Sequence, residues 1–367
     1  MHAQVSRTAF LSTLGQVQGV IEAKRTLPVL SHLLLEARGE TLSLSGTDLD
    51  VSIQTSLTGD IKVEGAVAVS GKKLYEIVRE LPEAPVDLRT GDGNHVEILC
   101  AKSSFRLKGI GAEEFPALSK IPEGLGTTLG ADTLRGMIAK TLFAVSSDQT
   151  RPTLTGALLQ VTEGHLWMVA TDGHRLSLVK TSIESTTKGD GPEVIIPRKA
   201  LTELGKMLKD ESGDVRLVPL DHQMAFLLSN SRLITRLIEG QFPNYQQVLP
   251  SPKGPGAVIR REDLSGALRR TSTVAGDRAT PTVLELKPGR LQLSCTNADV
   301  GDAREELVME YRGPETTVGF NARYLLDFLG VVEDSEIVMH VHDPLSPALF
   351  EPQKGEGFSC VIMPMRI

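Results

Sequence analysis

The sequence repeats itself with a period of about 124 residues. An apolar strand ends in a Thr-Asp step at Thr47-Asp48 and again at Thr171-Asp172, and a Thr-Asn step follows at Thr296-Asn297. Three further landmarks recur in the same order: a proline before that strand, an extended segment that leads into a basic helix start, and a closing Phe-Pro or Met-Pro step. This repetition predicts three copies of one structural unit, as in scaffolds that present one surface repeatedly.

The landmarks divide the 367 residues into three parts of ordinary domain size. We expect domains at residues 1–121, 127–250 and 256–367, because the segments between them are rich in proline and glycine. Each third alternates between helical periodicity and short strands, which predicts six helices and about two dozen strands. The expected helices span residues 10–17, 73–81, 132–145, 199–208, 262–273 and 323–331. The predicted fold class is therefore α+β, with two helices packed on β-sheets in each of three similar domains.

Composition excludes several protein classes. With 40% hydrophobic and 23% charged residues, each third can bury an ordinary core. No apolar run approaches the roughly 18 residues that span a bilayer, and the first residues lack the pattern of a signal peptide, so we expect a cytoplasmic protein with no membrane partner. The three cysteines lie far apart, which favours buried thiols, and we expect no metal and no cofactor.

Charge is segregated along the chain. The formal net charge is −7, yet the predicted helices carry about four more Lys and Arg than Asp and Glu. Positive charge on one layer of an acidic protein is what contact with the DNA backbone requires, although basic residues on helices are often only solvated. Aromatic residues make up only 4% of the chain, which disfavours a stacking surface for single strands and favours duplex DNA.

Helix dimensions limit how such a layer could surround DNA. Six helices, each about 10 Å wide, leave a bore of only about 10 Å when they stand around a pore. Twelve helices leave a bore of about 28 Å, which admits a duplex of about 20 Å with a layer of water. A ring around DNA would therefore require two chains.

Motifs spread over the whole length are similar to those of one bacterial family. They are residues 24–30 (Lys-Arg-Thr-Leu-Pro-Val-Leu), 46–49 (Gly-Thr-Asp-Leu), 170–176 (Ala-Thr-Asp-Gly-His-Arg-Leu), 241–245 (Gln-Phe-Pro-Asn-Tyr), 319–321 (Gly-Phe-Asn) and 361–367 (Val-Ile-Met-Pro-Met-Arg-Ile). In this order the set resembles the DNA polymerase III beta subunits, the sliding clamps. The resemblance implies a DNA clamp fold without catalytic activity, in which each chain forms half of a head-to-tail homodimeric ring around duplex DNA. It also implies protein partners, namely the polymerase alpha subunit, the clamp loader and other proteins with a clamp-binding motif.

The resemblance further implies a groove between the second and third domains that receives the clamp-binding peptide. The positions that match it are Leu154, Thr171, Gly173, His174, Arg175, Leu176, Pro243, Val248, Tyr324, Val361, Ile362, Met363, Pro364, Met365 and Arg366. Two methionines in the tail agree with this use, because flexible thioether side chains repack around different anchors. The residues alone leave open another interpretation, in which residues 361–365 are simply the last core strand.

DNA and dimer contacts are also implied by the resemblance. The matching basic and polar positions for DNA are Lys24, Gln149 and Arg151, with Arg25, Lys73, Arg79, Arg198 and Lys199 as further candidates. The dimer contact would bring Phe105 and Leu107 against Thr273 and Val274. The sequence departs from the family pattern at Gln246-Gln247, where relatives often carry basic residues, and at Thr273, which is a weak apolar anchor.

Two other classes of function compete with this interpretation. The chain could be an enzyme, either a hydrolase that uses His174 beside Asp172 or a metalloenzyme that uses residues 340–343 (His-Val-His-Asp). No phosphate-binding loop, nucleophile elbow or zinc spacing accompanies these residues, and Asp-Gly-His more often forms a turn. The remaining alternative is a repeat scaffold that binds only proteins.

Overall fold

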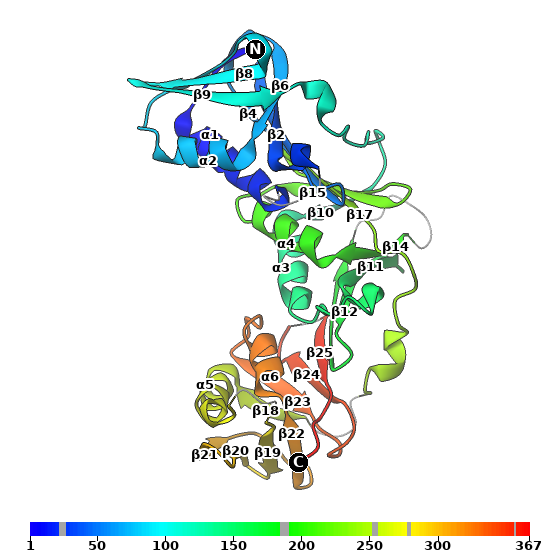
Figure 1. Ribbon diagram of the computed structural model, residues 1–367. Coiled ribbons are helices and arrows are strands. Elements are labelled where there is room, and N and C mark those ends of the chain that lie inside the picture. Colours follow the sequence, from blue (N-terminus) through cyan, green and yellow to red (C-terminus); the bar gives the residue numbers. More distant parts are fainter. Residues whose placement is uncertain (22–26, 184–190, 252–255, 277–279, 356) are drawn as a thin grey trace. The chain divides into compact units, whose positions relative to one another are not determined.

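The computed structural model describes residues 1–21, 27–183, 191–251, 256–276, 280–355 and 357–367 (Figure 1). Its elements follow one order three times: a strand, a helix, a group of strands, a second helix and three more strands. The described residues form six α-helices and 25 strands, which confirms the predicted α+β class. The linker predicted at 251–256 falls largely on residues 252–255, which lie outside the described residues.

The bounds of the elements make the repetition explicit. The first copy comprises β1 (His2–Val5), α1 (Arg7–Val17), β2 (His32–Arg38), β3 (Thr41–Thr47), β4 (Val51–Thr58), β5 (Asp60–Val63), β6 (Gly65–Ser70), α2 (Gly71–Glu80), β7 (Val86–Thr90), β8 (His95–Cys100) and β9 (Ser103–Ile110). The second comprises β10 (Thr127–Gly130), α3 (Ala131–Leu142), β11 (Gly156–Thr162), β12 (His165–Thr171), β13 (Arg175–Ser182), β14 (Glu193–Pro197), α4 (Arg198–Met207), β15 (Asp214–Pro219), β16 (Gln223–Leu227) and β17 (Ser231–Arg236). The third comprises β18 (Ala257–Arg260), α5 (Arg261–Thr271), β19 (Thr282–Lys287), β20 (Arg290–Asn297), β21 (Gly301–Val308), β22 (Thr316–Phe320), α6 (Ala322–Leu329), β23 (Glu336–His340), β24 (Ala348–Pro352) and β25 (Phe358–Ile362).

The helices are short and amphipathic. In α2, Leu74 and Val78 are buried four residues apart, whereas Lys72 and Lys73 point to solvent, as expected for a helix that covers one face of a sheet. The side chain of Asn321 accepts a hydrogen bond from the backbone N–H of Arg323 and caps the start of α6.

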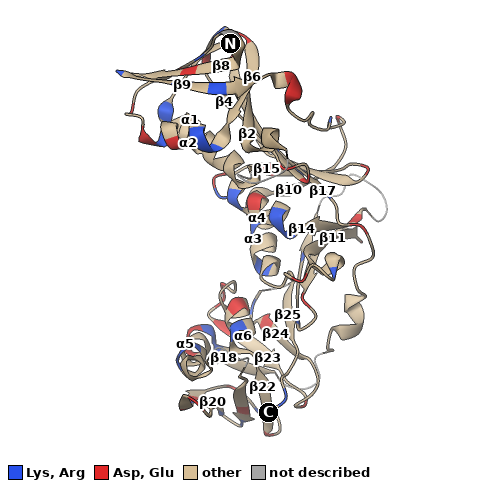
Figure 2. Ribbon diagram, in the orientation of Figure 1, with Lys and Arg blue, Asp and Glu red and all other residues tan. Residues whose placement is uncertain are grey.

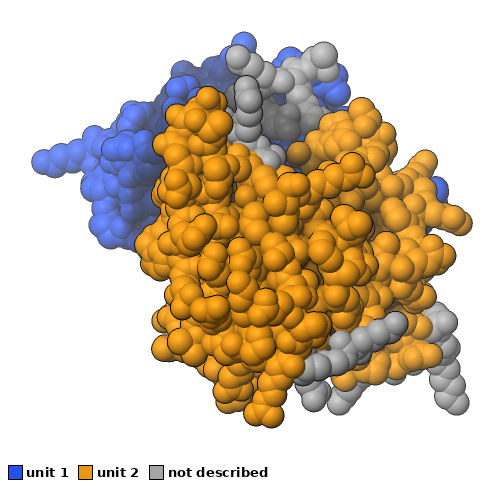
Figure 3. Space-filling view, turned by 90° about the horizontal axis from the view of Figure 1, so that it is seen from below, with its two compact units in different colours: residues 1–135, 184–186, 199–237 blue, residues 136–183, 187–198, 238–367 orange. Residues whose placement is uncertain are grey.

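The chain forms two compact units, and the second copy is divided between them (Figure 3). Residues 1–135 and 199–237 of the first unit hold a 13-stranded sheet that joins β17 of the second copy to β4 of the first. The second unit holds an eight-stranded sheet, in which β13 of the second copy pairs with β25 of the third, and a four-stranded sheet of β19 to β22. Each internal junction between copies is thus an antiparallel strand pair, and the three domain boundaries given above stay a prediction.

The Thr-Asp landmark forms the same turn in the first two copies. After β3, Asp48 Oδ1 accepts hydrogen bonds from the N–H groups of Asp50 and Val51. After β12, Asp172 Oδ1 accepts from the N–H groups of His174 and Arg175. After β20, Asn297 Oδ1 accepts from the N–H of Asp299, and the turn is one residue longer. A side chain that satisfies the backbone of a tight turn explains why these residue types recur at these positions.

The remaining expectations concern the membrane and the cysteines. Among the described residues, no helix is long and apolar enough to cross a membrane. All three cysteines are free and buried, in agreement with the expectation of buried thiols.

Candidate functional site

An open groove of about 170 Å³ lies on the second unit. It is formed by the turn between β12 and β13, the end of β25, a short 3-10 helix at Pro152–Leu154 and the loop after β17. Its lining residues are Leu154, Thr171, Gly173, His174, Arg175, Leu176, Pro243, Asn244, Tyr245, Val248, Val361 and Met363. The structure therefore brings together ten of the fifteen predicted peptide-binding positions.

Two lining residues, Asn244 and Tyr245, were missed by sequence reasoning. They belong to the Gln-Phe-Pro-Asn-Tyr motif at 241–245, so the motif itself was the signal that could have found them. The phenol O–H of Tyr245 donates to Gln160 Oε1 at 3.4 Å, and burial raises the pKa of this phenol. Tyr245 thus adds an aromatic side chain to the lining of the groove and has a hydrogen-bond partner for its hydroxyl.

The C-terminal tail is both a core strand and a wall of the groove. In β25, Val361 pairs with Leu176 and Ile362 pairs with Arg175, and both apolar side chains are buried. Beyond the strand, Met363 N–H donates to the carbonyl of His174 at 2.8 Å, and Met365 N–H donates to the carbonyl of Gly319 at 2.8 Å. The two interpretations of this segment are therefore compatible. The predicted positions outside the lining are Tyr324, Ile362, Pro364, Met365 and Arg366.

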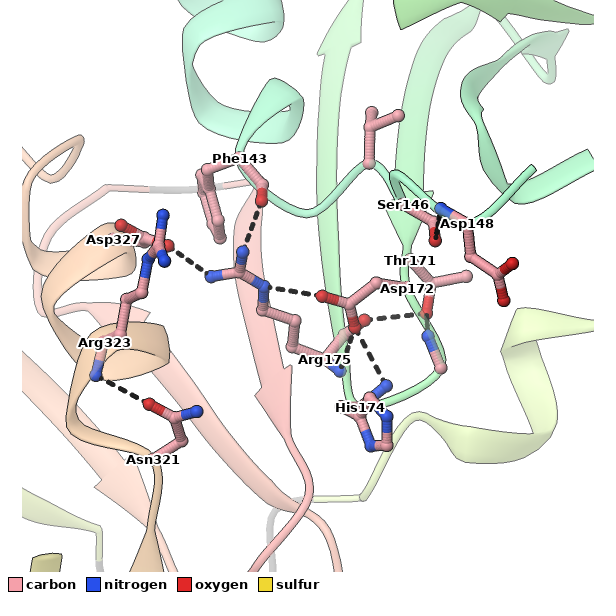
Figure 4. Close-up of polar contacts among 12 residues, drawn as sticks. Phe143, Ser146, Asp148, Thr171, Asp172, His174, Arg175, Asn321, Arg323 and Asp327 are labelled. Atoms are coloured by element: carbon pink, nitrogen blue, oxygen red, sulfur yellow. Dashed lines mark hydrogen bonds and ion pairs between the residues drawn. The ribbon is translucent and has the colours of Figure 1, made fainter. Parts of the chain in front are cut away.

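Arg175, one of the lining residues, makes several polar contacts with its neighbours (Figure 4). Its Nε donates to Asp172 Oδ2 at 3.1 Å, its Nη1 to Asp327 Oδ2 at 2.6 Å, and its Nη2 to the carbonyl of Phe143 at 2.5 Å. The guanidinium carbon lies 4.4 Å from the ring centroid of Tyr324 and 5.2 Å from that of Phe143. A side chain that is only 9% exposed thus makes charged hydrogen bonds and cation–π contacts together.

The acid/base pair proposed for an enzyme is not formed. Asp172 already receives hydrogen bonds from two backbone N–H groups of its turn and from the Arg175 guanidinium. Its contact with His174 is a hydrogen bond from the backbone N–H, not from the imidazole, and this bond stabilises the turn (Figure 4). Among the described residues, no group of three His, Cys, Asp or Glu side chains could hold a metal ion.

The candidate DNA contacts fall into three groups. Lys24 and Arg25 lie outside the described residues. Gln149, Lys73 and Arg79 are exposed, although Lys73 pairs with Glu76 at 2.8 Å and Arg79 with Glu80 at 3.0 Å.

The other three cations make closer internal contacts. Arg151 Nε donates to Asp148 at 2.8 Å and Arg198 Nη1 donates to the carbonyl of Val145 at 2.8 Å. Lys199 Nζ donates at 2.5 Å to the carboxylate of Asp48, which is only 1% exposed.

The helices carry the positive charge that the sequence predicted (Figure 2). Within their observed bounds, the six helices hold 13 Lys and Arg and 7 Asp and Glu. The excess of six exceeds the expected four because α1 begins at Arg7 and α5 at Arg261, both outside the predicted helices. The chain as a whole remains at −7, so the segregation of charge is strong.

The dimer candidates lie at strand edges and at the end of one helix. Phe105 is 39% exposed on β9, and Leu107 is half-buried on the same strand. Thr273 and Val274 form part of a 3-10 turn at Ser272–Val274 that follows α5. Among the described residues, β21 pairs only with β20, and β9 pairs with β8 but reaches β6 only at Gly109 and Ile110.

Comparisons with known proteins agree along the whole chain. Three family models, of the N-terminal, central and C-terminal domains of the DNA polymerase III beta subunit, match this chain. They match residues 1–119, 128–244 and 246–366, respectively. The chain belongs to the DNA polymerase III beta subunit family.

Relatives and solved structures give the same result. The beta sliding clamps of Pseudomonas putida and Caulobacter vibrioides are each 35% identical to the chain, with 100% of both chains covered. Crystal structures of the sliding clamps of Bartonella birtlesii and Pseudomonas aeruginosa, both bound to griselimycin, superpose with TM-scores of 0.95 and 0.96 at 34% and 33% identity and cover 100% of both chains. The chain is thus a DNA sliding clamp, a processivity subunit without catalytic activity, and the enzyme alternatives are set aside.

Proposed function

We propose that two copies of this chain close head to tail into a ring around duplex DNA and tether the replicative polymerase to it. The ring works in the cytoplasm, receives DNA with the help of a clamp loader, and holds partner proteins through short peptides in the groove. The ring proposal is carried by the two strand pairs that join the copies within one chain. Each pair independently predicts the same register for a third strand pair, which would join two chains.

The strands β4, β13 and β21 are equivalent in the three copies. In each copy the threonine of the turn lies opposite one residue of this strand, and the pairs are Thr47 with Ser52, Thr171 with Leu176, and Thr296 with Asp302. β4 and β13 each pair with a strand of the following copy, whereas β21 pairs only with β20 among the described residues. Its free edge is eight residues long, which is a template for pairing with another chain.

The same alignment supports β9 as the partner strand. Three equivalent residue pairs align β9 with β17 and β25. They are Ala68 with Ile110, Ile195 with Ile238, and Gly319 with Met365, and the first residue of each pair lies three positions before the start of a helix. If β9 pairs with β21 of a second chain as β17 pairs with β4, we expect Phe105 to lie opposite Ala303. The register of β13 with β25 gives the identical pair.

The chemistry of the paired residues supports this register. Phe105 takes the position of Leu233 and Cys360, which are both fully buried at the internal junctions, although Phe105 itself is 39% exposed in one chain. Ala303, its partner, shares a strand face with Glu305, which pairs with Arg270 of α5. Phe105 would therefore meet the side of β21 that α5 and its following turn cover, where Thr273 and Val274 lie. On the other face, Arg106 would stand opposite Asp302 with complementary charge.

A disulfide experiment tests the register. Ser104→Cys and Arg304→Cys in one chain would lie opposite each other across each interface of the ring, within the range of Cα separations that a disulfide bridges. We expect oxidation to give a covalently closed dimer, and native cysteines do not interfere because all three are buried. The control variant combines Ser104→Cys with Ala303→Cys. Ala303 is one residue away from the expected partner of Ser104, so the two cysteines would point to opposite faces of the sheet. A monomer in solution, or equal cross-linking of both variants, would contradict the proposal.

The groove supports the binding of an apolar peptide. An engineered cavity of about 150 Å³ holds one benzene molecule, so a groove of about 170 Å³ accepts one large apolar side chain, such as a Leu or Phe anchor. Its apolar lining comes from Leu154, Leu176, Pro243, Val248, Val361 and Met363, as in other small-ligand sites. Because two relatives were solved with griselimycin, we expect this compound to bind here too, and we assign it to this groove. Titration of labelled griselimycin, followed by displacement with a linear peptide that carries Leu and Phe, tests this, and simultaneous binding of both would contradict it.

A further inference from the structure

Asp327 lies outside the groove but contacts one of the residues that line it. It sits on α6, in the third copy, and does not belong to the lining residues. Its Oδ2 accepts the 2.6 Å hydrogen bond from Nη1 of Arg175, which does line the groove and comes from β13 of the second copy. Tyr324 lies three residues earlier on α6 and stacks on the same guanidinium at 4.4 Å, so one face of this helix presents both groups to Arg175.

The other polar partners of Arg175 are a carboxylate of its own turn and a neutral carbonyl. Asp172 Oδ2 accepts from Nε at 3.1 Å while Asp172 Oδ1 accepts from two backbone N–H groups of the turn, and Phe143 offers only its carbonyl. Asp327 is the carboxylate that reaches Arg175 from outside the turn, and its side chain is 32% exposed. Without that negative charge, a guanidinium that is 9% exposed would have a weaker set of partners and would move toward solvent or into the groove.

The neighbours of Arg175 make the groove sensitive to such a movement. Gly173, His174 and Leu176 flank it in sequence and all line the groove. The carbonyl of His174 also accepts a hydrogen bond from the Met363 N–H at 2.8 Å. A shift of this turn would therefore move the C-terminal tail that lines the groove. Sites need supporting contacts that hold the lining within a fraction of an ångström of the productive geometry.

We propose that Asp327 is a positioning residue for peptide recognition, which fixes Arg175 so that the turn at 173–176 and the tail keep the shape that the peptide requires. This inference rests on the proposed function of the groove. It differs from a merely structural role, in which the ion pair would join the second and third copies without any effect on ligand affinity.

The test compares conservative variants in the full-length protein. Asp327→Asn keeps the size and one acceptor but removes the charge, and we expect the dissociation constant for labelled griselimycin to rise about tenfold, the change that corresponds to 1.4 kcal/mol. Asp327→Glu keeps the charge on a side chain one methylene longer, and we expect partial rescue, to about threefold. The matched control is Asp334→Asn, an equally half-buried aspartate of the third copy that caps the backbone N–H groups of Lys354 and Gly355.

A double-mutant cycle separates positioning from general stability. In an Arg175→Met background, Asp327→Asn should cause no further loss of affinity, because its effect passes through Arg175. Equal affinity of wild type and Asp327→Asn would overturn the inference, as would an equal loss in the Asp334→Asn control. If Asp327→Asn does not fold, Asp327→Glu decides, and an affinity equal to that of wild type would overturn the inference. Failure of the wild-type protein to bind griselimycin would instead refute the proposed function of the groove.

Discussion

Replacement of Met363 by alanine should weaken ligand binding without disturbing the fold. The side chain of Met363 lines the groove and is half-buried, whereas its backbone N–H holds the tail to the carbonyl of His174 at 2.8 Å. Alanine keeps that backbone hydrogen bond and removes only the three heavy atoms beyond Cβ. The variant therefore isolates the contribution of the side chain to binding.

The magnitude follows from the apolar surface that is lost. Three buried groups at about 0.8 kcal/mol each give an upper bound of about 2.4 kcal/mol. Because most of Met363 is already buried in the free protein, at most about a third of this remains to be gained on binding. We therefore expect a loss of about 0.5–0.9 kcal/mol, or a rise in the dissociation constant of about 2- to 5-fold.

The assay is a fluorescence titration of labelled griselimycin with wild type, Met363→Ala and Leu125→Ala. Leu125 is also apolar and is 55% exposed, but it lies on the first unit and does not line the groove. The control should bind as wild type does, and melting temperatures of the variants should agree within a few degrees. Unchanged affinity of Met363→Ala, or an equal loss in Leu125→Ala, would refute the assignment of the tail as a wall of the groove.

Two other regions give testable outcomes. Lys199→Met removes the cation from the buried carboxylate of Asp48, which still accepts from two backbone N–H groups, so urea unfolding of the first unit should show a loss of about 2–3 kcal/mol. DNA loading by the same variant should change little, and a strong loading defect at full stability would instead make Lys199 a DNA contact. Burial raises the pKa of the Cys360 thiol to about 12, so the reactive thiolate is scarce at neutral pH, and iodoacetamide should modify this residue only after unfolding, as read by mass spectrometry. Rapid modification of Cys360 in the native protein would contradict its burial in the pairing of β13 with β25.

The repetition made much of the fold predictable from sequence. The Thr-Asp step marks a turn whose backbone N–H groups need a side-chain acceptor, so the same residues recur wherever the same turn does. The predicted helices differ from the observed ones by at most three residues at either end, because their apolar spacing follows the face that covers the sheet. The groove was predictable only through family resemblance, since an apolar tail on its own is equally typical of a core strand.

Partners distant in sequence were not predictable. Arg175 meets Asp327 across 152 positions and Phe143 across 32, and Lys199 meets Asp48 across 151. The contacts of Arg175 with Asp327 and of Lys199 with Asp48 follow from how strands of different copies pair, and local patterns of polarity carry no information on that pairing. The division of the second copy between two units has the same origin, because each junction continues a sheet from one copy into the next.

Retention on DNA tests the ring most directly. Contacts between cations and the DNA backbone weaken steeply as salt rises, and an excess of six positive charges on the helices of each chain supplies only modest direct affinity. A closed ring stays on circular DNA because the circle has no end over which the ring could slide off. The protein is loaded onto nicked circular DNA with a bacterial clamp loader, washed in high salt, and followed after a restriction enzyme linearises the circle. We predict retention on the circle through the wash and release on linearisation, whereas equal loss from circular and linear DNA in high salt would contradict encirclement.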